Sequence, residues 1–520
     1  MEKNSYRETI MNNPIPENTV KPISVTKTKI LPADCSIDLG DGSERGEYVD
    51  QDYILAKLGR PMRAINLMYC YYPNDKEWPK RASYVVSKKG GESPYDNYFP
   101  YTGGLTGKRH STSGPDVFEC MKDIRRHGED IILTITIDPK VSDKHLIAIA
   151  RELRPFGRIM VRINHEATGT WFSFNKRASY EELGLFFAHC CEIFHKEAPQ
   201  ARIILCLDGY TSLKTEKMVK ENEFKPAIKA ADIVSVDRYL SLHWGWPNDI
   251  AENGGNSFKS FGVRGVYALA KKSARRYDSI CRKHKPMVLS ELNADGDVNG
   301  PYDQCRMLKS FCNMVKRDKE KWLSGFTLYQ FRDRGRLGLE IQDPNNENVG
   351  IEQPLMNTFK EIISEPFFSP SFAEGKNVKL NKSGKPQAPV KMRWGGSEDS
   401  EGIALTYEIK GTPLFCECYF EDDLLDSSLM LEVNGRWFYK ASGTGFVDLM
   451  PAFFDSPKAK HKAITIRMFM TPSDGINDPS KGKSFGKNPK DDWAVNQYFE
   501  IKSLPVVRIE TTIPSRSRSV

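Results

Sequence analysis

Short apolar segments alternate with helical patterns over residues 35–331, and this alternation restricts the fold more than any other feature of the sequence. The segments are rich in β-branched residues and have the length of buried strands. Strands that alternate with helices form parallel βα units, and eight units suggest a closed (β/α)8 TIM barrel. An open doubly wound sheet is the alternative, yet the chain has no Gly-X-Gly-X-X-Gly or Walker pattern. The eight candidate strands are Cys35–Leu39, Met62–Tyr72, Ile131–Ile137, Arg158–Asn164, Arg202–Leu207, Asp232–Val236, Pro286–Ser290 and Gly325–Phe331.

The pattern changes along the chain and predicts its division into domains. Residues 1–30 are polar and contain several prolines, which predicts an extended N-terminal arm, and residues 31–368 hold the predicted barrel. Residues 369–388 have the composition of a linker. Residues 389–520 carry short strand-like segments and an Asn434-Gly435 hairpin pattern, which predict an all-β, sandwich-like domain.

The composition excludes several classes of partner. Basic and acidic residues number 75 and 68, and the body of the chain has no Lys/Arg block, so nucleic acid is not an expected partner. No apolar run reaches about 18 residues, so no membrane span is expected. The 11 cysteines form no Cys-X-X-Cys pair and mostly lie in apolar segments, as reduced thiols do. The N-terminus has no apolar signal segment, so we expect a cytoplasmic protein, or a secreted one if a leader has been removed.

Polar residues concentrate where the predicted strands end. In a (β/α)8 barrel the C-terminal ends of the strands form the active-site face. Packing does not explain such a concentration at one end of buried strands. The residues at these ends are Asp138, Glu166, Asp208, Asp237, Tyr239, Glu291, Gln330 and Arg332.

Two glutamates stand out among these residues. Glu166 follows the fourth strand and has Trp171 close by, and Glu291 ends the seventh strand. The two can face each other across the barrel mouth, and hydrolysis of a glycosidic bond requires two carboxyl groups that flank the bond. A Trp ring can stack on a sugar. The alternative is a purely structural role for both residues, in which Glu166 only caps the next helix and Asp237 only pairs with an arginine such as Arg162.

The stretch His165-Glu166-X-X-Gly169-X-Trp171-Phe172 resembles the acid/base motif of glycoside hydrolase family 26, which contains β-mannanases and β-1,3-xylanases. Residues 53–61, 231–239 and 285–291 are similar to its first helix, sixth strand and nucleophile strand, so the resemblance covers about residues 35–365. The chain departs from the family at Ala167-Thr168, where mannanases usually have Met-Asn, and at residues 329–331, where a Trp platform is common. The resemblance therefore leaves the sugar open.

The resemblance implies a retaining clan A glycosidase that needs no cofactor or metal and acts on a β-linked oligosaccharide or polysaccharide. Glu166 would be the general acid/base and Glu291 the nucleophile. His165 would orient a carboxylate or a sugar hydroxyl, Tyr239 would hydrogen-bond to the nucleophile, and Trp171 would stack on a sugar. The full set of expected substrate-binding residues is Asn164, His165, Trp171, Phe172, Asp237, Tyr239, Trp244, Trp246, Asn293, Tyr329, Gln330 and Arg332.

Other features leave alternatives open. A carbohydrate-binding barrel without turnover, or a transglycosylase with the same two glutamates, fits the same pattern. The long segment 73–113 is expected to be an irregular wall or lid of the cleft. The aromatic residues of the C-terminal region either form a sugar-binding face or pack in its core; they are Trp437, Tyr439, Phe446 and Trp493. The oligomeric state is not indicated.

Overall fold

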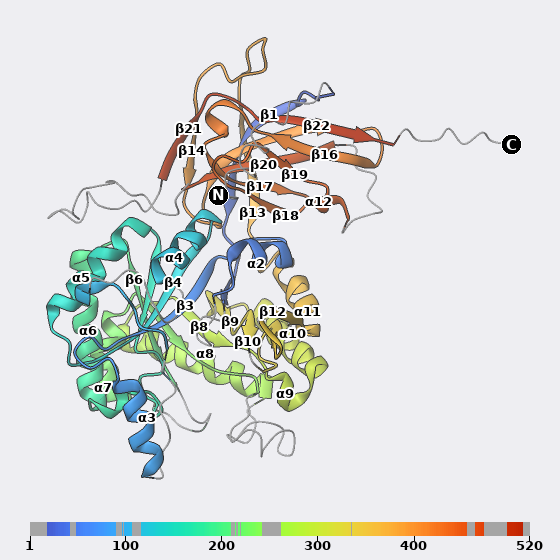
Figure 1. Cartoon of the computed structure of the whole chain (residues 1–520). Helices are drawn as coiled ribbons and strands as arrows, with labels where there is room; N and C mark the ends of the chain where they lie inside the picture. Colours follow the sequence, from blue (N-terminus) through green and yellow to red (C-terminus); the bar gives the residue numbers. More distant parts are fainter. Residues whose placement is uncertain are drawn as a thin grey trace.

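Eight parallel strands form a closed barrel in the first part of the chain (Figure 1). The computed structural model describes residues 18–41, 48–89, 96, 98–106, 116–209, 214, 217–218, 220–241, 262–333, 335–454, 463–472 and 497–512. β9 pairs with β2 and closes the ring, so the predicted (β/α)8 barrel is confirmed. The strands are β2 (Ser36–Gly40), β3 (Ala64–Tyr71), β4 (Asp130–Ile137), β5 (Ile159–Ile163), β6 (Arg202–Leu207), β7 (Ile233–Val236), β8 (Met287–Leu292) and β9 (Gly325–Leu328).

Helices follow the strands and surround the barrel. α6 (Tyr180–Glu197) begins with a capping box, in which the side chains of Ser179 and Glu182 each bond to the backbone of the other residue. One helix, α3 (Trp78–Lys88), lies inside the segment that we expected to be irregular. In the described part of the chain, no helix combines the length and apolar character that crossing a membrane requires. The other helices around the barrel are α2 (Gln51–Leu58), α4 (Val117–Arg126), α5 (Asp143–Leu153), α7 (Glu221–Ala230), α8 (Gly262–Cys281), α9 (Gly296–Asn299), α10 (Pro301–Arg317) and α11 (Pro354–Ile363), whereas α12 (Pro451–Phe454) belongs to the C-terminal region.

The interior of the barrel has layers of different chemistry. Nearer the N-terminal ends of the strands lies an apolar layer of Ala64, Ile132, Met160, Ile204 and Val288. Because side chains alternate between the two faces of a strand, a step of two residues stays inside the barrel. That step leads to a mostly polar layer, closer to the C-terminal ends, of Asn66, Thr134, Arg162, Cys206 and Ser290.

The C-terminal region forms antiparallel sheets, as predicted for this part of the chain. The larger sheet has the order β13-β1-β15-β20-β17-β18, with β14 and β21 attached through β15, and the smaller has the order β19-β16-β22. Buried residues of both sheets share one apolar core. Their strands are β1 (Ser24–Leu31), β13 (Ser371–Asn377), β14 (Val390–Trp394), β15 (Glu401–Glu408), β16 (Pro413–Tyr419), β17 (Ser428–Val433), β18 (Arg436–Lys440), β19 (Phe446–Asp448), β20 (Ala463–Thr471), β21 (Gln497–Ile501) and β22 (Val506–Thr511). A separate small sheet follows β9 and contains β10 (Arg332–Asp333), β11 (Glu340–Asp343) and β12 (Asn346–Glu352).

Two segments that we expected to be an arm and a linker contain strands of the larger sheet. All of β1 except Leu31 lies within residues 1–30, and β13 lies within residues 369–388. β1 pairs with β13 on one side and with β15 on the other. Their sequences lack a clear apolar alternation because β13 is an exposed edge strand and β1 buries few of its side chains. The division into domains by sequence remains a prediction, and the chain enters the C-terminal sheet before it enters the barrel.

The antiparallel sheets cover the N-terminal ends of the barrel strands. Gly128, just before β4, lies so close to Trp394 of β14 that a Cβ there would be 2.7 Å from the indole ring. Ser36 Oγ of β2 donates a hydrogen bond to Glu398 Oε2 at 2.7 Å, and Ser397 Oγ donates to the carbonyl of Met62 at 2.8 Å. This leaves the C-terminal ends of the strands at the opposite end of the barrel from the sheets.

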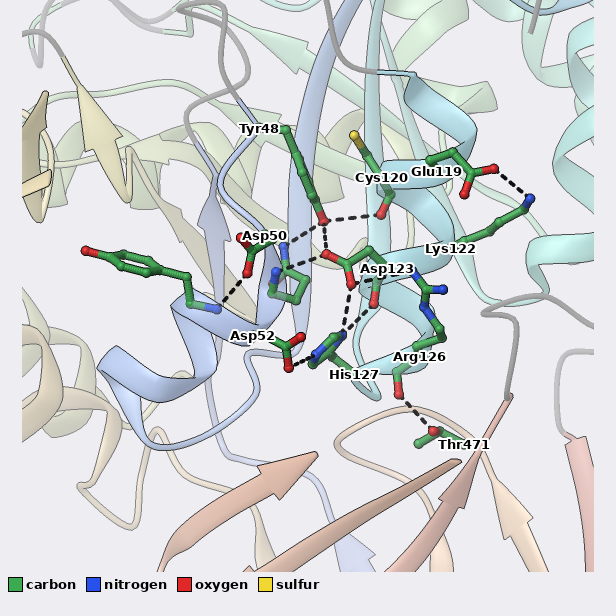
Figure 2. Close-up of polar contacts among 12 residues, drawn as sticks. Tyr48, Asp50, Asp52, Glu119, Cys120, Lys122, Asp123, Arg126, His127 and Thr471 are labelled. Atoms are coloured by element: carbon green, nitrogen blue, oxygen red, sulfur yellow. Dashed lines mark hydrogen bonds and ion pairs between the residues drawn. The ribbon is translucent and has the colours of Figure 1, made fainter. Parts of the chain in front are cut away.

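His127 lies between two helices of the barrel and also contacts the sheets; Figure 2 shows its polar contacts with Asp52 and Asp123. Its Nε2 lies 2.9 Å from Asp52 Oδ1, its Nδ1 lies 3.2 Å from Asp123 Oδ1, and its ring centre lies 4.0 Å from that of Tyr439. Burial lowers the pKa of His127, but the hydrogen bonds to Asp123 and Asp52 outweigh it and raise the pKa to about 10. The imidazole is therefore a buried cation that bridges α2 and α4 and contacts β18.

The aromatic residues of the C-terminal region divide between contacts with the barrel and internal packing. Trp437 is buried beside Phe372 and Phe469 and shares a cluster with Leu55 of α2, and Tyr439 packs on His127. Phe446 packs on Tyr419. Trp493 lies outside the described residues. For Trp437 and Tyr439 the structure thus gives the packing alternative, not a free sugar-binding face.

Candidate active site

A sharp turn after β5 places Glu166 at the C-terminal end of the barrel. Asn164 and Glu166 have left-handed backbones, with φ of 48° and 50°, so the chain reverses as soon as the strand ends. The Asn164 side chain accepts a hydrogen bond from the Ile137 N–H at 2.7 Å and donates to the Ile137 carbonyl at 3.1 Å. These two bonds tie the turn to the end of β4. Asn164 therefore holds the backbone that carries Glu166.

Glu166 is a half-buried carboxyl group in a negative environment. Burial raises its pKa well above the ordinary value, and the nearby carboxylates of Asp237 and Glu291 raise it further. The indole Nε1 of Trp171 donates to Glu166 Oε2 at 2.6 Å and opposes this shift. The net effect keeps a proton on Glu166 at a pH where an exposed glutamate has lost it.

Glu291 has the opposite environment. It lies near the end of β8 and is buried. Its Oε1 accepts a hydrogen bond from Arg162 Nη2 at 2.9 Å, and its Oε2 accepts one from the Tyr239 hydroxyl at 2.7 Å. Both oxygens act as acceptors, which is the hydrogen-bonding pattern of an ionised carboxylate. Tyr239 thus makes the contact that the resemblance implied.

Arg162 is shared by two carboxyl groups below the mouth. It comes from the middle of β5, has no exposed surface, and donates from Nη1 to Asp237 Oδ2 at 3.2 Å as well as to Glu291. Burial lowers the pKa of Arg162, but Asp237 and Glu291 reverse this and leave it above the ordinary value. Burial and the charge of Glu291 raise the pKa of Asp237 to about 7, against the effect of Arg162.

The three acidic side chains meet at one point. Carboxylate oxygens of Glu166, Asp237 and Glu291 all lie within 4.8 Å of one another. Oxygens at such spacing could also serve as ligands of a cation. The guanidinium of Arg162 already supplies a positive charge to two of them, and the expectation that no metal takes part remains a prediction.

Aromatic rings enclose His165 next to this cluster. Tyr98 stacks over the imidazole with 6.2 Å between ring centres, and Phe172 packs against it at 4.4 Å. Burial and the charge of Arg162 lower the pKa of His165 well below its ordinary value, so the ring is neutral. His165 Nε2 lies 3.9 Å from Glu291 Oε1, and its Nδ1 has no hydrogen-bond partner among the described residues.

The remaining predicted site residues occupy different places. Trp171 uses its indole N–H on Glu166, Phe172 is buried, and Tyr329 packs edge-on against Tyr239 with 5.7 Å between ring centres. Trp244 and Trp246 lie outside the described residues.

Three predicted residues bond to the protein itself. Asn293 is fully buried and donates to the carbonyls of Tyr329 and Leu337. Gln330 is buried and donates weakly to Asp333 at 3.4 Å. Arg332 is paired with Glu340 at 3.0 Å beside α2. The partners described for these three side chains do not include Glu166, Asp237 or Glu291, so a structural role accounts for them.

The sequence indicated Arg162 only as a structural partner of Asp237, and it gave no indication of Tyr98. The clue to Arg162 was an arginine in the middle of the apolar segment Ile159–Ile163, where a charge requires buried partners. Tyr98 had no such clue, because it approaches His165 from a loop far away in the sequence.

Comparisons with known proteins find similar structures but no similar sequences. No family model matches the chain, and no curated protein matches it. An endo-beta-1,4-mannanase double mutant from Cellulomonas fimi is 13% identical, with 84% of this chain and 89% of that chain covered and a TM-score of 0.41. A GH26 beta-mannanase from Bacteroides ovatus is 10% identical, with 64% and 90% covered and a TM-score of 0.41. A family 51 alpha-L-arabinofuranosidase from Bifidobacterium longum is 10% identical, with 88% and 100% covered and a TM-score of 0.40.

Proposed function

We propose that the chain is a retaining glycoside hydrolase that cleaves β-linked glycans or oligosaccharides of the mannan, xylan or glucan type. The observation that carries the proposal is the pair Glu166 and Glu291, with carboxylate oxygens within 4.8 Å and opposite environments. Retaining glycosidases hold their two carboxyl groups roughly 5–5.5 Å apart, whereas inverting enzymes leave about 6.5–9.5 Å for a water molecule. The short separation therefore favours a covalent intermediate.

In the first step Glu291 attacks the anomeric carbon. Arg162 and Tyr239 hold both of its oxygens, which fixes the orientation of the carboxylate. At the same time Glu166 gives its proton to the glycosidic oxygen. Because Oε2 of Glu166 accepts the Trp171 N–H, the proton belongs on Oε1. The bond to the leaving sugar breaks, and Glu291 becomes bonded to the anomeric carbon.

In the second step Glu166, now ionised, takes a proton from a water molecule. The water attacks the anomeric carbon and releases Glu291, so the two inversions restore the original configuration. When Glu291 becomes esterified its negative charge disappears, and the repulsion that raises the pKa of Glu166 decreases. The pKa of Glu166 then falls, as its change from acid to base requires.

The experiment compares the parent with Glu291→Gln and Glu166→Gln on β-mannans, β-xylans, β-glucans and galactans, with released sugars quantified. We expect turnover of one polymer class and a loss of at least about 1,000-fold in kcat for Glu291→Gln. Glu166→Gln should lose less on aryl glycosides whose leaving group needs no proton. Glu197→Gln is the matched control, since Glu197 is a buried glutamate paired with Arg151 and Arg154 away from the cluster.

Four results would contradict the proposal. Activity that survives Glu291→Gln removes the nucleophile. Inverted configuration of the first product, seen by NMR, removes the covalent step. Binding of a glycan without turnover by the parent favours a carbohydrate-binding barrel, and longer products in place of free sugars favour a transglycosylase with the same carboxylates.

A further inference from the structure

A buried chain of hydrogen bonds crosses the barrel interior below Glu291. Arg162 Nε donates to Thr134 Oγ1 at 2.8 Å, and Thr134 Oγ1 donates to Asn66 Oδ1 at 2.7 Å. The Arg162 and Thr134 side chains have no exposed surface, and Asn66 has 3%. These residues come from three neighbouring strands, β5, β4 and β3. The chain therefore connects Arg162 with the side of the barrel away from β7 and β8.

The strand register places these side chains side by side. Thr134 and Arg162 are partners in the β4–β5 pairing. Asn66 lies on β3 directly opposite Ile132, two residues before Thr134 on the neighbouring strand. All three belong to the polar layer that rests on the apolar layer of the barrel interior. Barrel strands are rigid elements, so the hydrogen-bond chain is anchored to the scaffold and not to loops.

The direction of each hydrogen bond is fixed by chemistry. A guanidinium can only donate, so Thr134 must accept from Arg162 with a lone pair. The hydroxyl has a single proton, and the oxygen of the Asn66 amide takes it. This arrangement directs the Thr134 O–H toward Asn66 and leaves a lone pair of its oxygen facing Arg162 Nε. The other two nitrogens of the guanidinium then have one geometry available, in which Nη1 meets Asp237 and Nη2 meets Glu291.

We propose that Thr134 and Asn66 are positioning residues, which set the orientation of the Arg162 guanidinium and through it the place of the Glu291 carboxylate. The inference rests on the proposed function, because it needs Glu291 to be the nucleophile. Neither residue touches a substrate, since both lie below the carboxylate cluster and are buried. Without the Thr134 hydroxyl, the planar group keeps only its bonds to Asp237 and Glu291 and loses the one that ties it to the barrel scaffold. A displacement of about 1 Å at a reacting group can lower a rate by about 100-fold.

The test uses Thr134→Val, which has nearly the same shape and lacks the hydroxyl, and Thr134→Ser, which keeps it. Asn66→Leu removes the acceptor of the Thr134 proton but leaves the bond from Arg162. We expect kcat to fall by about 10- to 100-fold in Thr134→Val with little change in KM. Asn66→Leu should lose less, and Thr134→Ser should retain activity close to that of the parent.

Thr136→Val is the matched control. Thr136 lies two residues further along β4 on the same inner face, is equally buried, and its hydroxyl has no hydrogen-bond partner among the described residues. Thr136→Val therefore replaces a hydroxyl by a methyl group, as Thr134→Val does, but breaks no hydrogen bond among the described residues. Crystal structures of the parent and of Thr134→Val give a readout that needs no substrate, because they show whether the guanidinium still contacts Glu291 and Asp237.

The outcomes separate this inference from the proposed function. If Glu291→Gln is inactive while Thr134→Val keeps the kcat of the parent, the positioning role is wrong and the hydrolase proposal stands. If Thr136→Val loses as much kcat as Thr134→Val, the effect is one of packing and the inference also fails. If the parent has no activity on any glycan, the crystal structures decide, and an unmoved Arg162 in Thr134→Val overturns the positioning role.

Discussion

The two ends of the barrel both contain buried charges, and they differ in how the charges are matched. At the end covered by the sheets, Arg63 pairs with Asp38, and Asp130 receives both Arg125 at 2.9 Å and Arg158 at 3.0 Å. At the open end, one guanidinium, that of Arg162, serves Asp237 and Glu291 while Glu166 adds a third carboxyl group. The apolar layer that begins with Ala64 and Ile132 separates the two ends.

This difference distinguishes charges that hold the protein together from charges that perform chemistry. Removing the cation from a buried ion pair destabilises the fold strongly, so such pairs matter for stability. Where carboxyl groups outnumber the nearby cations, their mutual repulsion favours a proton on one of them, and here Asp237 and Glu291 help to raise the pKa of Glu166. Buried charges therefore occur at both ends of the strands, but the cluster of three carboxyl groups around one guanidinium marks the C-terminal end as the candidate active site.

Among the changes that test this comparison of the two ends, the largest effect is expected from Arg162→Met. The change leaves Asp237 and Glu291 buried together without their cation, and it removes the group that orients Glu291. We expect kcat/KM to fall by about 100- to 1,000-fold. Steady-state kinetics on the glycan identified with the parent measure this. Retention of more than a tenth of the activity would mean that the charge balance at the mouth does not matter for turnover.

Arg63→Met makes the corresponding change at the covered end. It leaves Asp38 without its cation, and breaking a buried pair in this way costs about 3–5 kcal/mol of unfolding free energy. Urea unfolding measures the loss. Below the unfolding transition kcat should remain within about twofold of the parent, because Arg63 lies on the far side of the apolar layer. A loss of kcat as large as in Arg162→Met would break the comparison between the two ends.

Trp171→Phe tests the proton on Glu166. The indole N–H lowers the pKa of Glu166, so its loss should let the pKa rise and move the basic limb of the kcat/KM profile to higher pH. We also expect kcat at the optimum to fall by about tenfold, since the proton is no longer directed to one oxygen. Trp322→Phe is the control, because that indole N–H donates to the Tyr267 hydroxyl outside the site. A shift to lower pH would show that Trp171 acts in another way.

The smallest effect concerns the pH dependence of stability at the covered end. Burial raises the pKa of Glu129 from its ordinary value of 4.5 to about 8, and one of its oxygens has no hydrogen-bond partner among the described residues. The folded protein therefore keeps a proton that the unfolded chain loses. The contribution to stability is complete below pH 4.5 and disappears as the pH rises through 8.

Glu129→Gln should remove this dependence. The unfolding free energy of each protein is measured in urea at pH 5, 7 and 9. Between pH 5 and 8 that of the parent should fall more steeply with pH than that of the variant, by at most about 1.4 kcal/mol per pH unit. Parallel curves for the two proteins would mean that Glu129 is ionised when folded. Activity per folded molecule should not change, since Glu129 lies before β4 at the end away from Glu166.

Local pattern was sufficient to predict the barrel and the two glutamates. Most of the eight strands coincide with a short segment rich in apolar residues, although Cys35–Leu39 was only a weak candidate, and Glu166 and Glu291 stand at the ends of two of these segments. The hairpin at Asn434-Gly435 was also predictable from the sequence, because Asn and Gly tolerate the positive φ that this turn requires. Both residues adopt it. Such features depend on residues that are neighbours in the sequence.

The rest depended on residues that meet only in the folded chain. β1 and β13 become strands because each finds a partner hundreds of residues away, although neither has a strong pattern of its own. Trp171 was expected to stack on a sugar, and only the turn after β5 shows that its N–H reaches Glu166. Arg162, Thr134 and Asn66 form a unit because parallel pairing places three distant segments in register.

The sequence by itself thus determined which elements form and where the carboxyl groups stand, since apolar periodicity and turn chemistry act over a few residues. Only the tertiary structure decided which carboxyl group is surrounded by other acids and which is held by Arg162 and Tyr239. The physical reason is that a pKa depends on burial and on charges within a few ångströms, and closure of the barrel sets both.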